Sequence, residues 1–208
     1  MKKLLLLLLC VLLITVSALA DGDLAIATMD SLLAADCPGA ALLDARWLPS
    51  EPGALIGLYT LGDHVGAAIY QQQEDQSFTV ASRNDELFAL MDDAQCLLDG
   101  WPENDPDIWY TAPGESYFLR IARSSQGDWI VRHMAYTRTE RDIQYALSED
   151  EESLIVSDVT WPRIWWPIDR DALALSDIDV SKICDLCDEA VDYMHATNPL
   201  GYRIDWDE

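Results

Sequence analysis

Three tryptophans fall within seven residues in the last quarter of the chain: Trp161, Trp165 and Trp166. Pro162 and Pro167 interrupt this segment, and since proline cannot donate to a sheet ladder, we expect the segment to break the strand pattern at a sheet edge. Adjacent side chains of an extended segment point to opposite sides, so Trp165 and Trp166 cannot share one buried face. The pattern predicts that the three tryptophans border a ligand-binding surface, unless a helix covers them as part of the core.

The arginines gather in one region of an otherwise acidic chain. Residues 116–148 carry five arginines and three acids, although the whole chain has 13 Lys and Arg against 37 Asp and Glu. Guanidinium groups bind oxygen acceptors through several N–H donors. We therefore predict that Arg120 and Arg132 join the tryptophans in binding a carboxylate or a sugar hydroxyl. The alternative is that these arginines only pair with the surplus acids.

Four cysteines follow residue 20, namely Cys37, Cys96, Cys184 and Cys187. In an exported chain they can form disulfides, and the sequence leaves all three complete pairings open. Cys184 and Cys187 have the CxxC spacing of redox proteins, which stabilise a thiolate by positive surroundings. Asp185 and Asp188 would instead raise the thiol pKa values, so we expect structural cysteines. Neither a second CxxC nor a paired-histidine motif completes a zinc site.

Closely spaced aspartates recur as Asp105/Asp107, Asp169/Asp171, Asp177/Asp179 and Asp205/Asp207. Calcium prefers clustered oxygen ligands of this kind. An EF-hand loop starting at Asp177 fails, because Lys182 occupies the position that requires glycine. We therefore predict no cofactor, and calcium is the one ion that the acids would suit.

Hydrolytic chemistry would need side chains that converge in space. The segment Gly114-Glu115-Ser116 begins like a nucleophile elbow but lacks its final glycine. A Ser–His–Asp triad or a pair of carboxylates is defined by geometry instead of spacing. Among 37 acids and three histidines the sequence marks no such set, so no catalytic residue is predicted.

The charge of the chain excludes several classes of partner. Its net charge of −24 repels phosphate backbones, so we expect no nucleic-acid binding, and it disfavours anionic membrane surfaces. Only one lysine, Lys182, follows residue 20. Covalent catalysis by lysine and a phosphate-binding loop are therefore disfavoured.

Residues 1–20 have the pattern of a secretory signal peptide: two lysines, an apolar run from Leu4 to Ile14, and the ending Ala18-Leu19-Ala20. Cleavage would leave residues 21–208 as a single exported domain with a net charge of −26, secreted or otherwise outside the cytoplasm, with no membrane insertion. The lesser alternative is an uncleaved anchor, because 17 residues from Leu4 to Ala20 reach the lower limit for spanning a bilayer. Lipidation at Cys10 is less favoured still.

Strand-like runs separated by turn residues dominate the rest of the chain. They cover 54–61, 64–71, 77–82, 87–91, 95–98, 108–112, 116–123, 129–138, 143–147 and 154–161. A helix is expected over 24–35, another from Asp177 or Asp179 to Ala196, and a short strand over 202–206; residues 87–98 could alternatively be helical. Hairpin-length connections indicate a mainly β (α+β) fold, an antiparallel meander, sandwich or partly closed barrel with both helices packed on it.

Two functions fit these features. The first is an exported, acidic, non-catalytic module that binds a surface polymer, a peptide or a partner protein through exposed aromatic side chains. The second is an exported hydrolase that uses a carboxylate pair or a Ser–His–Asp triad. A pocket with converging acids, or with a serine beside a histidine, would favour the second function.

Overall fold

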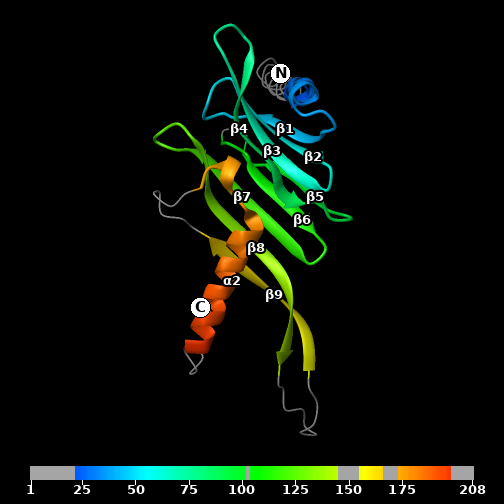
Figure 1. Ribbon diagram of the computed structural model, residues 1–208, viewed down its shortest axis with the longest axis vertical. Coiled ribbons are helices and arrows are strands. Elements are labelled where there is room, and N and C mark those ends of the chain that lie inside the picture. The colour runs from blue at the N-terminus through cyan, green and yellow to red at the C-terminus, as the bar shows by residue number, and fades with distance from the viewer. Residues whose placement is uncertain (1–21, 102–103, 145–154, 166–172, 198–208) are drawn as a thin grey trace, which may run out of the picture.

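The computed structural model describes residues 22–101, 104–144, 155–165 and 173–197 (Figure 1). The expected leader over 1–20, the expected strand over 202–206 and Trp166 lie outside these ranges. The predictions that concern those residues therefore remain predictions.

The strands form two antiparallel sheets, and each strand pairs with its neighbour in the chain. The four-stranded sheet contains β1 (Ala41–Trp47), β2 (Ala54–Leu61), β3 (His64–Gln72) and β4 (Phe78–Ala89). The five-stranded sheet contains β5 (Gln95–Asp99), β6 (Asp107–Ala112), β7 (Glu115–Arg123), β8 (Trp129–Gln144) and β9 (Ile155–Trp165). The predicted fold class, mainly antiparallel β with a short N-terminal helix and a C-terminal helix packed on it, is confirmed.

The N-terminal helix covers one face of the four-stranded sheet. Its described part, residues 22–36, lies beside β1 and β2 in Figure 1. The cluster between helix and sheet contains Ala25, Met29, Leu33, Leu55, Tyr59, Ala68 and Tyr70. Gly57 permits this approach, because a Cβ there would come within 2.5 Å of Met29 Cγ. β2 and β3 consequently bury both faces, which explains their nearly continuous apolar sequences.

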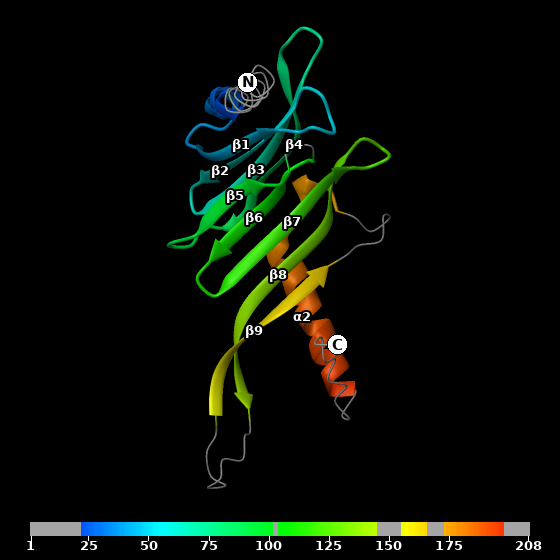
Figure 2. The ribbon, with the colours of Figure 1, turned by 180° about the vertical axis from the view of Figure 1, so that it is seen from behind.

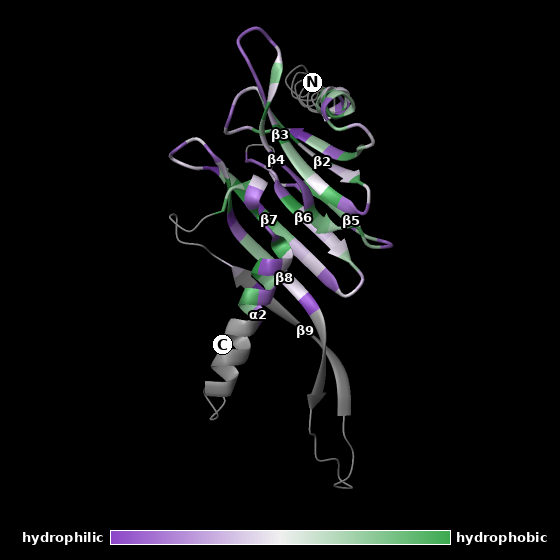
Figure 3. Cartoon of the chain, in the orientation of Figure 1, coloured by the Kyte–Doolittle hydropathy of each residue, from purple (hydrophilic) through white to green (hydrophobic). Residues whose placement is uncertain are grey.

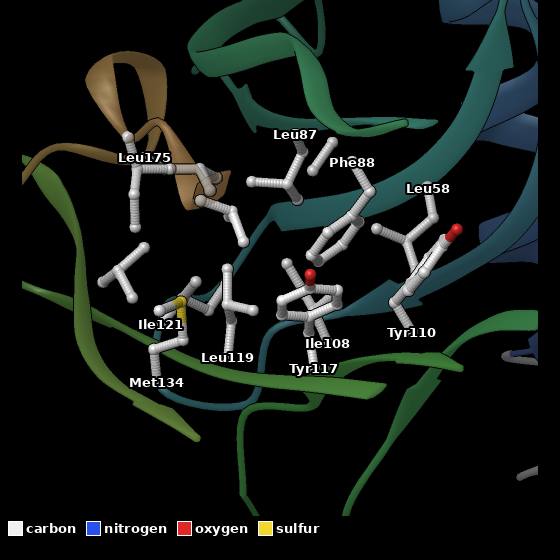
Figure 4. Packing of buried hydrophobic residues seen from close by; sticks show 14 of the residues in the cluster. Leu58, Leu87, Phe88, Ile108, Tyr110, Tyr117, Leu119, Ile121, Met134 and Leu175 are labelled. Carbon is white, nitrogen blue, oxygen red and sulfur yellow. The ribbon is translucent and has the colours of Figure 1, made fainter. Parts of the chain in front are cut away.

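The main core lies between the two sheets (Figure 4). Leu58, Leu87 and Phe88 of the four-stranded sheet face residues of β6, β7 and β8. The Phe88 ring stacks on Tyr110 and on Tyr117, with centroids 4.7 and 5.5 Å apart. These contacts hold the sheets together as a sandwich without a closed barrel.

The segment η2 (Leu175–Asp177) and helix α2 (Val180–Thr197) cover one side of this core. The first turns of α2 are amphipathic, as their alternating colours in Figure 3 show: Ile183 and Cys184 are buried, whereas Lys182 and Asp185 are exposed. The Tyr136 hydroxyl donates to Asp188 Oδ1 at 2.8 Å and so ties α2 to β8. Within the described ranges, no helix is long and apolar enough to cross a membrane.

Two polar side chains make contacts at the edges of the core, one between the two sheets and one between β4 and the η2 segment. Asp44 of β1 accepts the backbone N–H of Leu98 in β5 at 2.9 Å, so the first strands of the two sheets are linked. At the other edge, buried Asn84 of β4 donates to the carbonyl oxygens of Leu175 and Ile178 at 3.0 and 2.9 Å. The core is thereby bounded on both sides by polar contacts.

The strand assignments depart from the sequence-based expectation in several places. Residues 41–47 form the unpredicted strand β1, and the alternative helix over 87–98 is absent. The expected turn at residues 83–85 lies inside β4, where Val65 pairs with Phe88 but Ala67 pairs with Asn84, which marks a bulge. Pro162 does not break the pattern: β9 continues to Trp165, because it borders the described sheet and its outer edge needs no donor.

Candidate functional site

Arg120 lies on the outer face of the five-stranded sheet, which is turned toward the viewer in Figure 2. Its neighbours Leu119 and Ile121 point into the core, so strand alternation directs Arg120 outward, with 55% of its side chain exposed. The guanidinium donates to both carboxylate oxygens of Asp107, at 3.0 and 2.9 Å, and this pairing raises the pKa of Arg120. The two opposite charges therefore neutralise each other.

A row of apolar side chains crosses the same face. Cross-strand pairing places Leu97 beside Trp109, and Trp109 beside Phe118. The Trp109 and Phe118 rings meet edge to face at 4.7 Å, and the Arg120 guanidinium lies 5.4 Å from the Phe118 centroid. Leu97 and Trp109 are each 42% exposed. We call Leu97, Trp109 and Phe118 the aromatic row.

His133 extends this arrangement into β8. Its ring meets Phe118 edge to face at 5.7 Å. Burial, together with nearby Arg120, lowers the pKa of His133. The imidazole is therefore neutral at pH 7, and it adds a further aromatic surface instead of a charge.

A recess of about 340 Å³ lies next to the aromatic row. It is lined by Gly100, Trp101, Asn104, Asp105, Asp107, Arg120 and Ile121. Trp101 is 74% exposed. Ser50 fixes Asp105, donating its backbone N–H at 3.0 Å and its hydroxyl at 2.5 Å. The recess thus combines an exposed indole ring with oriented carboxylates and a guanidinium.

Two of the residues predicted to form one binding surface, Trp165 and Arg120, lie on opposite faces of the sheet. Trp165 pairs with buried Met134 and packs, half-buried, against the core, so it occupies the inner face, opposite Arg120. Trp161 lies in β9 opposite Arg138, but its side chain is outside the described part. Arg132 is exposed at a shift in the β7–β8 register. Among the predicted binding residues whose side chains are described, Arg120 lines the recess.

Sequence reasoning missed Trp101, Trp109 and Phe118. A usable signal existed for two of them, because the Pro113-Gly114 turn sets the pairing of β6 with β7. Counting outward from that turn places Trp109 opposite Phe118 on one face. No comparable rule locates Trp101, which lies in the connection between β5 and β6.

A second recess, of about 410 Å³, bears on the hydrolase alternative. Its lining includes His64, Glu86, Glu115, Tyr117, Arg138 and Ser181. His64 Nδ1 lies 2.8 Å from Asp63 Oδ1, and Glu115 accepts the Tyr117 hydroxyl at 3.0 Å. No hydrogen bond between Ser181 and His64 is found among the described residues. Suitable groups gather here, but they are not connected as a nucleophile and its base.

The four cysteines are free thiols in the structure. Burial raises the pKa of Cys96 and of Cys184 to about 12, and it also raises the pKa of Cys187. These thiols stay protonated at neutral pH. The CxxC pair on α2 therefore lacks the thiolate that redox exchange requires.

The described aspartate pairs are engaged in protein contacts. Asp105 and Asp107 bind Ser50 and Arg120, as above, while Asp179 accepts the backbone N–H of Lys182 at 3.0 Å in the first turn of α2. The pairs at 169/171 and 205/207 lie outside the described ranges. In the part of the chain that is described, no group of three His, Cys, Asp or Glu side chains is arranged to hold a metal ion.

Comparison with protein-family models, curated proteins and solved structures finds no match. Any assignment of function therefore has to come from the arrangement of the residues themselves.

Proposed function

We propose that this protein is an exported, non-catalytic binding module that holds a surface polymer or a partner protein on the outer face of its five-stranded sheet. The observation that carries the proposal is the aromatic row, in which Leu97 and Trp109 remain 42% exposed. Exposed apolar residues that adjoin one another on a rigid face, with an arginine beside them, have the composition of a binding hot spot. Export is supported by the leader sequence of residues 1–20.

The shape of the face favours binding over catalysis. The aromatic row lies on a regular sheet, a surface that suits an extended or broad partner better than a small enclosed substrate. Its charged groups Arg120 and Asp107 already satisfy each other, which orients them without generating a reactive base. The recess near Ser181 offers less support for hydrolysis, since its serine and histidine are not joined.

Removal of Trp109 tests the proposal directly. Residues 21–208 would be immobilised and exposed to the medium and surface material of the producing cells, and retained protein and polysaccharide would both be quantified. If Trp109 is a hot spot, Trp109→Ala should weaken retention by about 30-fold or more. Its unfolding free energy should fall by less than the roughly 3–5 kcal/mol expected for a fully buried tryptophan, because 42% of Trp109 is exposed.

Val80→Ala serves as the matched control. Val80 is also an exposed apolar residue, but it lies on β4 in the other sheet. This variant should retain the partner as the unaltered protein does. Equal retention by Trp109→Ala and Val80→Ala would contradict the assignment of the binding face.

A further inference from the structure

The recess beside Trp101 adjoins the aromatic row through Arg120 and Asp107. Arg120 lines the recess and also lies over the Phe118 ring, while Asp107 precedes Trp109 by two residues on the same strand and face. Positions two apart on a strand are about 7 Å apart. If one unit of a polymer occupies the recess, the next unit along the polymer would therefore lie over the aromatic row. This spacing suits a ligand made of repeated units.

The charges of the recess select an uncharged ligand. Asp107 neutralises Arg120, and Asp105 gives the described lining residues a surplus negative charge, within a molecule whose net charge is −24. An anionic chain would be repelled at this site. A hydroxyl group can donate to a carboxylate and accept from a guanidinium or an amide, so it suits Asp107, Arg120 and Asn104 without carrying charge.

Backbone pairing with a peptide is disfavoured next to this face. β5 is the edge strand nearest the aromatic row, and the backbone N–H of Leu98 in this strand is already bound by Asp44. A peptide could not add to β5 as a further strand without displacing that contact. Recognition here has to use side chains, and the side chains present are indole rings, carboxylates, an amide and a guanidinium.

These observations lead to one ligand class. We propose that the recess binds one sugar ring of an uncharged polysaccharide, with the apolar C–H face of the ring on Trp101 and its hydroxyls bonded to Asn104, Asp107 and Arg120. The following sugars of the chain lie over Trp109 and Phe118. This inference rests on the proposed binding function and specifies its partner.

Titration with defined oligosaccharides tests the inference. Residues 21–208 would be titrated with cellohexaose, laminarihexaose, maltohexaose and chitohexaose, and with hexagalacturonate as the charged comparator, by calorimetry and tryptophan fluorescence. At least one uncharged hexasaccharide should bind, more tightly than its own monosaccharide, and should shift the tryptophan emission. Trp101→Ala should weaken that binding more than tenfold, whereas Val80→Ala should leave it unchanged.

Three results would overturn the inference. Binding of hexagalacturonate as tight as that of every uncharged chain would refute the charge argument. Binding of no uncharged chain, while Trp109→Ala still releases a protein partner in the retention experiment, would leave the binding face standing with a protein as its ligand. If Trp109→Ala retains as much protein and polysaccharide as the unaltered protein does, and no sugar binds, the proposed function fails as well.

Discussion

Asp85 of β4 connects this strand to β2 directly and to the N-terminal helix through Arg83. It accepts the Tyr59 hydroxyl at 2.5 Å and the Nε and Nη2 groups of Arg83 at 2.6 and 2.7 Å. Arg83 also reaches the carbonyl oxygen of Asp36 at the end of the N-terminal helix, at 3.3 Å. The contacts with Arg83, and then with Tyr59, hold the pKa of Asp85 below its ordinary value.

We predict that Asp85→Asn removes part of the acid sensitivity of the fold. A carboxyl whose pKa is lowered by folding stabilises the protein above its unfolded pKa of about 4, and this contribution is lost as pH falls through the folded pKa. The variant should be less stable at pH 7 by roughly 1.5–3 kcal/mol, as expected for a lost charged hydrogen bond. The difference should shrink toward pH 3 in urea unfolding.

Asp92→Asn is the control for this experiment, since Asp92 is exposed in a turn. The unfolding free energy of this variant should equal that of the unaltered protein at each pH. If the loss of stability in Asp85→Asn stays constant from pH 7 to pH 3, the carboxylate charge does not stabilise the contacts with Tyr59 and Arg83.

The residue types around Asp85 explain why the sequence alone misplaced it. Arg83, Asn84 and Asp85 have the composition of a turn, because Asn and Asp favour turns through local hydrogen bonds. In the structure these residues lie at a bulge, where Asn84 turns to η2 and Asp85 turns to Tyr59. Both partners are distant in sequence, so no local pattern could reveal them.

At the scale of elements, the N-terminal helix depends on the absence of a side chain at Gly57. We predict that Gly57→Ala destabilises the protein by about 1–3 kcal/mol, as overpacking does, because the new methyl group would collide with Met29. Thermal or urea unfolding would measure this. The double variant Gly57→Ala/Met29→Ala should lose less unfolding free energy than the two single variants lose together, because the shorter side chain at position 29 makes room for the new methyl group.

Gly22→Ala is the matched control for the same chemical change. Nothing lies within 4 Å of a Cβ at Gly22, which is in the same helix that Met29 belongs to. This variant should be neutral or slightly stabilising, because alanine favours helix more than glycine does. Equal effects at Gly22 and Gly57 would contradict the packing argument.

Elements with a strong strand pattern next to a short turn were predictable from the sequence. The hairpin of β2 and β3 is one example, because two apolar runs flank Gly62-Asp63. β7 is another, because Leu119 and Ile121 alternate with Arg120. β1 was missed because a register shift between Leu42 and Asp44 interrupts the alternation of its side chains. In the candidate site, the outward direction of Arg120 follows from the alternation of β7, whereas its proximity to Trp101 depends on a loop and on no periodic pattern.

At the scale of the whole molecule, excess negative charge opposes folding. The chain has 13 Lys and Arg against 37 Asp and Glu, so most acids have no basic side chain to pair with. We predict that adding NaCl raises the melting temperature of residues 21–208 modestly, because screening weakens the repulsion among these acids. Differential scanning calorimetry from low to high salt measures the effect.

Calcium chloride at equal ionic strength is the comparison for this measurement. It should give the same increase as NaCl if the described acids act only through their summed charge. A fall in melting temperature with NaCl would mean that favourable ion pairs outweigh the repulsion.

The strand order also determines when each part of the molecule can assemble during synthesis. Within each sheet every strand after the first pairs with the strand before it, so such a strand finds its partner already exposed when it emerges from a ribosome or an export pore. The four-stranded sheet is complete once residue 89 has emerged, whereas Asn84 waits for Leu175 and Ile178, about 90 residues later. Such local pairing favours rapid folding, and the last helix closes a core whose strands are already in register.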